Sequence, residues 1–374
     1  MKDINVVKSN THILNIFRES DVFEGRDNLI CLDMNERVSA FPETFFQDML
    51  SNITSKMFSS YPHIGPLYRK LENFTGLKSN WLCLGAGSDS LIRRAFQAYL
   101  SPGDRLVTPK PTYGMYNVWA RVFEARHDTL DYSATLKLDI DKFIYTIGDN
   151  ARIVALASPD QPTGHTVELK NIQRIADKTA DKNTLLLIDE AYFPFGKQTA
   201  QNLLKQYPHL LIIRSFSKAG GLAGLRVGYA MAAPEIIQAL HAVRGPGEVN
   251  SIGAYMAAYL LDHPDIMEQF YKAVQEGRSI LIKAATKMGF DAPRCDGNFQ
   301  LLRVPIEITP KTLADALKRQ NYLIKSGFSH HSLEQYVRVT LDGPKIMDTF
   351  IKTLASVTEE LLSSSRTTST NETV

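Results

Sequence analysis

Short runs of consecutive apolar residues alternate with helical patterns between about residue 50 and residue 260. The runs are DRLVTP, ARIVALASP, NTLLLIDEAYF, HLLIIRSFS and RVGYAMAA. Strands that are apolar at consecutive positions are typical of a parallel sheet with both faces covered. Between two of these runs, VELKNIQRIADKTA has its apolar residues at helical spacing. The alternation predicts an α/β fold with a doubly wound sheet.

The pattern changes after residue 260. LLRVPIEI, YLIKSG and YVRVTLDG predict strands, while TPKTLADALKRQN and PKIMDTFIKTLASVTEELLSS predict helices, the second with Pro344 in its first turn. We expect a compact α+β unit that residues of the N-terminus join, with long helices linking it to the preceding region. The predicted organisation is an N-terminal arm and part of the small domain at 1–45, a large domain at 46–262, a small domain at 263–364 and a disordered tail at 365–374.

The composition of the 374-residue chain is that of an ordinary globular protein, with 44% hydrophobic and 22% charged residues. A net charge of +2 gives no overall preference for nucleic acid or for an anionic membrane, so neither is an expected partner. The apolar runs are too short to cross a bilayer, and the first residues lack the form of a secretory signal. The three cysteines share no CxxC spacing, which predicts reduced thiols in a cytoplasmic protein and no structural metal site.

The segment RSFSKAGGLAGLRVGY, at residues 214–229, places a single lysine among serines, glycines and small apolar residues. Ser215, Ser217 and Arg226 combine two hydroxyl groups with a guanidinium fork, which suits a phosphate group. Lys218 lies in the same loop, and a lysine amine forms a Schiff base with an aldehyde cofactor. The alternative is an ordinary exposed loop lysine, but the small apolar flanks argue against it.

Other candidates follow predicted strands, and each has a purely structural alternative. Asp189 ends an apolar run at the edge where open α/β sheets bind ligands, yet capping a helix would suit it equally. Gln161 precedes a Pro–Thr–Gly turn that needs no function, and the aromatic Tyr113 suits packing. Gly87 and Ser88 open a helix whose free N–H groups favour an anion, although neither GxGxxG nor GxxxxGK[ST] occurs in the sequence.

Taken in chain order, these segments resemble the fold-type I pyridoxal-phosphate enzymes of the class I/II aminotransferase superfamily, and among them the histidinol-phosphate aminotransferase group. The matching segments are YPHIGPLYRKLENFTGL, GAGSDSLI, PTYGMY, DQPTG, DEAYFPF, SFSKAGGLAGLRVGY and YVRVTL. Several motifs in the same order are far more specific than any one of them. The resemblance implies a large domain with a mostly parallel seven-stranded sheet flanked by helices, a smaller α+β domain, and pyridoxal 5′-phosphate as the cofactor.

The resemblance also implies roles for individual residues. Lys218 would hold the cofactor covalently and shuttle a proton, and Asp189 would pair with the pyridinium nitrogen. Tyr192 and Gln161 would contact the ring hydroxyl, and Tyr113 would stack on the ring. The phosphate would be bound by Ser215, Ser217, Arg226, the backbone at Ala86, Gly87 and Ser88, and Tyr61 from the neighbouring subunit of a homodimer. The substrate would contact Arg338, Asn35 and Lys325.

Two departures from the family pattern leave the reaction open. Gln161 stands where the family usually carries an asparagine, and its longer side chain must bend to reach the ring oxygen. Lys325 stands where the histidinol-phosphate enzymes usually carry an arginine, so it keeps the charge but loses the bidentate fork. His330 and His331 nearby are interpreted as solvated loop histidines, with a contribution to substrate binding as the alternative.

The leading prediction is an enzyme of amino acid biosynthesis that moves an amino group between an amino acid, or an amino-phosphate such as histidinol phosphate, and a 2-oxo acid by a ping-pong route. A decarboxylase or oxidase of an amino acid on the same scaffold is the alternative, because the grip on the substrate decides which bond breaks. A cofactor-binding protein without turnover would not need Lys218, Asp189 and Arg226 together. A nucleotide-binding Rossmann protein would need a phosphate fingerprint that this sequence lacks.

Overall fold

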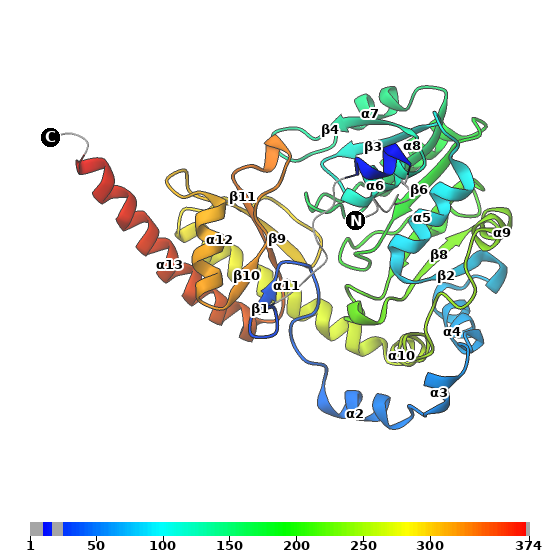
Figure 1. Ribbon diagram of the computed structural model, residues 1–374, viewed down its shortest axis with the longest axis horizontal. Helices are drawn as coiled ribbons and strands as arrows, with labels where there is room; N and C mark the ends of the chain where they lie inside the picture. The colour runs from blue at the N-terminus through cyan, green and yellow to red at the C-terminus, as the bar shows by residue number, and fades with distance from the viewer. Residues whose placement is uncertain (1–9, 17–24, 372–374) are drawn as a thin grey trace, which may run out of the picture.

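The computed structural model describes residues 10–16 and 25–371. A large region, built of a sheet with its helices, lies beside a smaller unit (Figure 1). The large sheet has seven strands in the order β2-β8-β7-β6-β5-β3-β4. They are β2 (Leu82–Gly85), β3 (Arg105–Lys110), β4 (Arg126–Asp131), β5 (Ala151–Ala157), β6 (Leu185–Asp189), β7 (Leu210–Ser215) and β8 (Gly228–Ala232). Only β8 pairs antiparallel with its neighbours in this sheet; the other pairs are parallel. The predicted α/β fold and mostly parallel seven-stranded sheet are confirmed.

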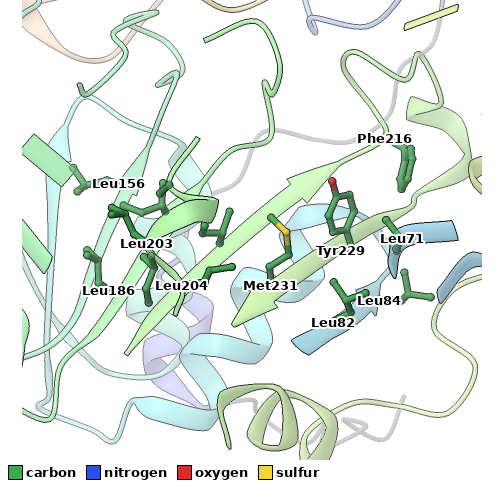
Figure 2. Packing of buried hydrophobic residues seen from close by; sticks show 14 of the residues in the cluster. Leu71, Leu82, Leu84, Leu156, Leu186, Leu203, Leu204, Phe216, Tyr229 and Met231 are labelled. Atoms are coloured by element: carbon green, nitrogen blue, oxygen red, sulfur yellow. The ribbon is translucent and has the colours of Figure 1, made fainter. Parts of the chain in front are cut away.

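The consecutive apolar residues of the central strands are explained by cores on both faces of the sheet. Leu186 of β6 and Met231 of β8 belong to one core, whereas Leu187 and Ala230 point to the other face. Figure 2 shows part of the first core, where Leu156, Leu186 and Met231 come from three different strands. Because successive side chains of a strand alternate between faces, a strand covered on both faces needs apolar residues throughout.

The helices divide between the two faces of the sheet. One face is covered by α2 (Glu43–Ser51), α4 (Gly65–Thr75), α7 (Ile140–Ile147), α8 (Leu169–Thr179) and α10 (Ser251–Leu261). The other is covered by α5 (Gly87–Tyr99), α6 (Gly114–Val122) and α9 (Pro234–Ala242). The short helices α1 (Thr11–Leu14) and α3 (Lys56–Ser59) complete the region. None of the helices in the described ranges is both long enough and apolar enough to span a bilayer.

The smaller unit contains two two-stranded sheets. In one, β9 (Phe299–Arg303) pairs antiparallel with β11 (Tyr336–Thr340); in the other, β1 (Ile30–Leu32) pairs parallel with β10 (Tyr322–Ile324). The pairing of β1 brings the N-terminal region to this unit. The helices α11 (Pro264–Lys287), α12 (Pro310–Arg319) and α13 (Pro344–Asn371) surround a separate core that contains Leu301, Val339 and Phe350.

The structure differs from the predicted elements at two places in this unit. The strand expected from LLRVPIEI ends at Arg303, because Pro305 has no N–H to donate to a ladder and a turn follows. The predicted disordered tail begins at residue 365, but the backbone of α13 continues as a helix to Asn371. No glycine or proline follows Pro344 within this helix to end it earlier. Residues 372–374 of the predicted tail lie outside the described residues.

Candidate active site

The candidate site lies at the sheet edge where β5, β6 and β7 end. Asp189 is the last residue of β6 and Ser215 the last of β7. Gly228, the first residue of the antiparallel β8, pairs with Ser215 on one side and with Gly85 at the end of β2 on the other. This register places the loop after β2, the loop after β7 and the residues before β8 side by side. Open α/β sheets bind ligands at this edge.

Gly87 and Arg226 form an anion cradle at the start of α5. Gly87 has φ of +79°, and a Cβ atom there would lie 2.5 Å from Arg226 Nη2. Arg226 Nη1 lies 3.4 Å from Ser217 Oγ, and the Ser217 N–H donates to Ser215 Oγ at 3.1 Å. A glycine is therefore required for the guanidinium to reach the helix N-terminus, where free backbone N–H groups favour an anion. The geometry brings together Gly87, Ser215, Ser217 and Arg226, with Ala86 as the N-cap of α5 and Ser88 in its first turn.

Asp189 is a buried carboxyl group that forms no ion pair with any residue that the structure describes. Tyr116 Oη donates to Asp189 Oδ2 at 3.2 Å, and the Ala191 N–H donates to Oδ1 at 3.0 Å. Burial, and to a smaller extent the nearby carboxylates of Asp160 and Asp89, raise the pKa of Asp189 to about 7. A protonated ring nitrogen of a ligand would supply the missing positive charge and restore the carboxylate form.

Tyr192 joins the N-terminal region to the site. Asn35 Nδ2 donates to Tyr192 Oη at 2.8 Å, and the Asn35 N–H donates to Thr340 Oγ1 at 2.9 Å. The backbone oxygen of Asn35 also accepts from Asn298 Nδ2 at 2.9 Å. Burial raises the pKa of Tyr192 to about 12, so its hydroxyl stays protonated and is available as a donor. The structure therefore brings the predicted Asn35 and Tyr192 together.

The amine of Lys218 lies near Tyr192 and the N-terminal region. Lys218 Nζ donates to the backbone oxygen of Met34 at 2.9 Å and lies 5.7 Å from the ring centroid of Tyr192. Burial, and after it the positive charge of Arg338, lower the pKa of Lys218 to about 8. A lowered pKa increases the neutral fraction of the amine, which is the nucleophilic form.

Arg338 on β11 presents unpaired hydrogen-bond donors to the site. Its side chain is buried, and Nη2 donates to the backbone oxygen of Asp33 at 2.6 Å. Arg338 Nε and Nη1 are also buried but have no hydrogen-bond partner among the described residues. Leaving such donors unmet is costly, especially on a charged group, so this arrangement suits an anionic ligand.

Lys325 is held directly opposite Arg338. The Lys325 N–H donates to the Arg338 backbone oxygen at 3.1 Å, and the Arg338 N–H donates back at 2.8 Å. Residues paired in this way carry their side chains on the same face of a sheet. The structure thus places two positively charged residues of the smaller unit next to one another.

Three predicted residues have different surroundings. Tyr113 is the N-cap of α6, and its ring meets that of Tyr116 edge-on at 5.8 Å; burial and the nearby charges of Asp89 and Asp189 raise its pKa. Gln161 lies partly buried in the turn after β5, at the same sheet edge. Tyr61 is 93% exposed, so this chain does not enclose it with the other site residues.

Sequence reasoning missed two buried groups and misplaced a third. Thr112 Oγ1 donates to Asp160 Oδ1 at 2.5 Å, and burial raises the pKa of Asp160 to about 6. Asp160 comes shortly after the apolar strand β5, just as Asp189 comes at the end of the apolar strand β6. This similar position was the sequence signal that could have identified Asp160. Tyr116, the donor to Asp189, lies one helical turn from Tyr113. The interpretation of His330 as a solvated residue is wrong, because its side chain is only 7% exposed and its Nε2 lies 3.5 Å from Asp131 Oδ2, whereas His331 is exposed.

The arrangement fits a cofactor with an aldehyde, a ring nitrogen and a phosphate group. The cradle of Gly87 and Arg226 suits the phosphate, Asp189 suits the ring nitrogen, and the amine of Lys218 suits the aldehyde. These are the groups of pyridoxal phosphate. The free donors of Arg338 remain for an anionic substrate.

Comparisons with known proteins agree with this chemistry. The family model described as aminotransferase class I and II matches residues 42–353. Histidinol-phosphate aminotransferase 1 of Methylococcus capsulatus is 30% identical over 84% of this chain and 87% of its own length, and histidinol-phosphate aminotransferase of Thermococcus kodakarensis is 29% identical over 90% and 95%. The solved structure of histidinol-phosphate aminotransferase from Sinorhizobium meliloti in complex with pyridoxal-5′-phosphate has a TM-score of 0.84 at 22% identity, covering 95% of this chain and 99% of that one. At that identity the structural likeness shows the fold.

Proposed function

This chain belongs to the class I and II aminotransferases, and from that premise we propose that it moves an amino group from a phosphorylated amine of the histidinol phosphate type to a 2-oxo acid. It is a transferase that depends on pyridoxal phosphate. The names of the relatives support the choice of donor, since both are histidinol-phosphate aminotransferases. The place of the enzyme would be in amino acid biosynthesis in the cytoplasm.

One observation carries the proposal of an anionic donor: the buried guanidinium of Arg338, which neighbours Lys325, has two donors that no described residue accepts from. A phosphate ester carries up to two negative charges and several acceptor oxygens, which a pair of neighbouring cations satisfies well. Lys325 binds as a point charge and not as a planar fork, so it tolerates more than one orientation of the phosphate.

The roles of the chain's own residues follow from their positions. The bound cofactor supplies an aldehyde for the amino group and a ring that accepts electrons from the neighbouring carbon. Lys218 would remove the proton from the carbon that bears the amino group and return it to the carbon that carried the aldehyde, because its pKa of about 8 makes both forms of the amine accessible near neutral pH. Asp189 keeps the ring nitrogen protonated, and Arg226 with Ser217 anchors the phosphate. Tyr192 and Gln161 would contact the ring oxygen, and Tyr113 would stack on the ring.

The functional unit in this proposal is a homodimer. Tyr61 is 93% exposed, and nearby Phe58 is 75% exposed, so the segment around α3 offers aromatic side chains to a second copy. Tyr61 of the neighbouring subunit would then complete the phosphate site. The proposed domain boundaries of each chain remain 1–45, 46–262 and 263–364. In this proposal, residues of the first segment contribute to the site together with residues of both domains.

The experiment that tests the function is a donor panel read by absorbance. The protein is loaded with pyridoxal phosphate and mixed, without acceptor, with histidinol phosphate, aromatic amino acids or other amines. We expect histidinol phosphate to convert the cofactor band to that of the pyridoxamine form, and a 2-oxo acid to restore it. Absence of conversion with every donor would contradict transamination.

A decarboxylase or oxidase is the second candidate, and Gln161 is the observation in its favour. The departure at this position alters the contact with the ring oxygen, so it bears on which bond is broken. Release of carbon dioxide or peroxide without conversion to the pyridoxamine form would select this candidate over transamination.

A further inference from the structure

A group of two histidines and one aspartate lies outside the site described above, and we propose that Asp131, His330 and His331 bind a divalent transition-metal ion, with Zn²⁺ as the probe. The ligand atoms of the three residues all lie within 4.8 Å of one another. Asp131 ends β4, at the edge of the large sheet farthest from β2, and the histidines lie between β10 and β11 of the smaller unit. The ion would connect the two regions.

The distances are close to those of a real coordination sphere. His330 Nε2 lies 3.5 Å from Asp131 Oδ2. Two ligands of a tetrahedral Zn²⁺ with bonds of about 2.0–2.1 Å are about 3.3 Å apart, so these two atoms need almost no movement. The rings of His330 and His331 lie 4.3 Å apart between centroids, and His331 is exposed, so its side chain is free to rotate toward the ion. Water would complete the coordination.

The surroundings of His330 orient it for this role. Its Nδ1 lies 2.8 Å from Ser332 Oγ, and burial to 7% exposure restricts the ring. Metal-binding histidines typically engage their second ring nitrogen with a polar partner, which directs the other nitrogen to the ion. In the metal-free protein the Ser332 N–H donates to Nδ1 at 3.4 Å, which puts the ring proton on Nε2 toward Asp131. Binding of the ion would shift that proton to Nδ1, where Ser332 Oγ can accept it, and free the Nε2 lone pair for the ion.

The chemistry of the three side chains selects the class of ion. Imidazole nitrogen suits Zn²⁺, Ni²⁺, Cu²⁺ and Fe²⁺, whereas Mg²⁺ and Ca²⁺ prefer sets of oxygen ligands. A second group of potential ligands in the described residues is formed by Cys31, Asp33 and Glu36. Its two carboxylates already pair with Arg26, at 3.1 Å for Asp33 and 2.5 Å for Glu36, so the guanidinium competes with any ion there.

The test is calorimetric titration of Zn²⁺ into protein loaded with pyridoxal phosphate and purified without a histidine tag. We expect saturable binding by the wild type. Asp131→Asn and His331→Ala should each weaken it by about 10- to 100-fold, the effect found when even the hydrogen-bond partners of metal ligands are changed. At the same concentration, Zn²⁺ should also raise the thermal unfolding midpoint of the wild type by more than that of either variant. Mg²⁺ should do neither.

Matched variants distinguish this site from adventitious binding. His63→Ala removes an exposed histidine outside the group, and Cys31→Ser alters the second group; both should bind Zn²⁺ as the wild type does. Unfolding in the presence of a chelator checks that Asp131→Asn and His331→Ala are folded, and both residues are exposed, so neither should be destabilised. Equal Zn²⁺ affinity of the wild type and these two variants would overturn the proposal, as would no binding by the wild type or loss of binding in Cys31→Ser.

Discussion

The two sides of the active site differ in how far the chain satisfies its own polar groups. On the large sheet, Arg226 contacts Ser217, and Asp189 accepts two hydrogen bonds. On the smaller unit, Arg338 has two buried donors without partners among the described residues. A permanently bound group needs a site that is already organised, whereas a substrate that comes and goes must supply the missing partners itself. The comparison separates a side for the cofactor from a side for the substrate.

The largest expected effect is that of Lys218→Ala, which removes the proton-transferring group from the cofactor side. The rate of amino transfer should fall by about 10³-fold or more, because a positioned acid–base group contributes at about this level. Phosphate anchoring by Arg226 should remain, so the variant should still bind pyridoxal phosphate. Single-turnover kinetics and equilibrium dialysis measure the two quantities. Loss of cofactor binding together with activity would show that the phosphate cradle cannot hold the cofactor without Lys218.

Gly87→Ala tests whether the cofactor side is organised in advance. The new Cβ would displace Arg226 and would sit at a strained positive φ, so pyridoxal phosphate should bind about 100-fold more weakly through loss of a charge-assisted contact. Fluorescence titration of the cofactor provides the measurement. Gly103→Ala is the control, since Gly103 has a φ of +87° but nothing within 4 Å of its Cβ. Equal cofactor affinity in both variants would argue against the cradle.

Arg338→Ala tests the substrate side. The KM for the amino donor should rise by about 10- to 100-fold, since hydrogen bonds to a charged group contribute about 1.5–3 kcal/mol. The cofactor spectrum should stay unchanged, because Arg338 is assigned to the substrate. Steady-state kinetics and absorbance check the two parts. A variant with a normal KM but an altered spectrum would reverse the assignment of the two sides.

A smaller effect concerns the pH dependence of stability, to which the buried Asp189 contributes. Burial raises the pKa of Asp189 to about 7 from an ordinary value near 4, so the cofactor-free fold binds a proton more tightly than the unfolded chain does. Its contribution to stability is full below pH 4 and is lost as the pH rises to 7, with a slope of at most about 1.4 kcal/mol per pH unit. Asp189→Asn should remove this slope.

Urea unfolding of the cofactor-free protein between pH 4 and 8 measures the difference between Asp189→Asn and the wild type. The variant should gain relative stability as the pH rises. A constant difference across this range would mean that Asp189 is ionised in the cofactor-free protein, and that the carboxylate has a partner closer than the structure shows.

The same comparison explains what the sequence allowed us to predict. The cofactor side comes from segments that directly follow buried strands, so Lys218, Asp189 and Arg226 could be found from local patterns and from their order along the chain. The placement of the Arg338 guanidinium depends on Asp33, which lies 305 residues away in the sequence, and no local pattern reveals a contact between segments so far apart along the chain. The burial of His330 depends likewise on Asp131 at the end of another strand. Sequence spacing therefore predicts groups that act near one strand end better than contacts between distant segments.

The register at Gly228 has a consequence for the order of folding. Gly228 pairs with Gly85 and with Ser215, so two halves of the phosphate cradle meet only after a strand from late in the large domain has inserted between strands from its two ends. Contacts between segments so far apart in sequence form late, because closing the intervening chain costs entropy before the pairing returns it. Uptake of pyridoxal phosphate would then have to wait for the pairing of β2 with β8.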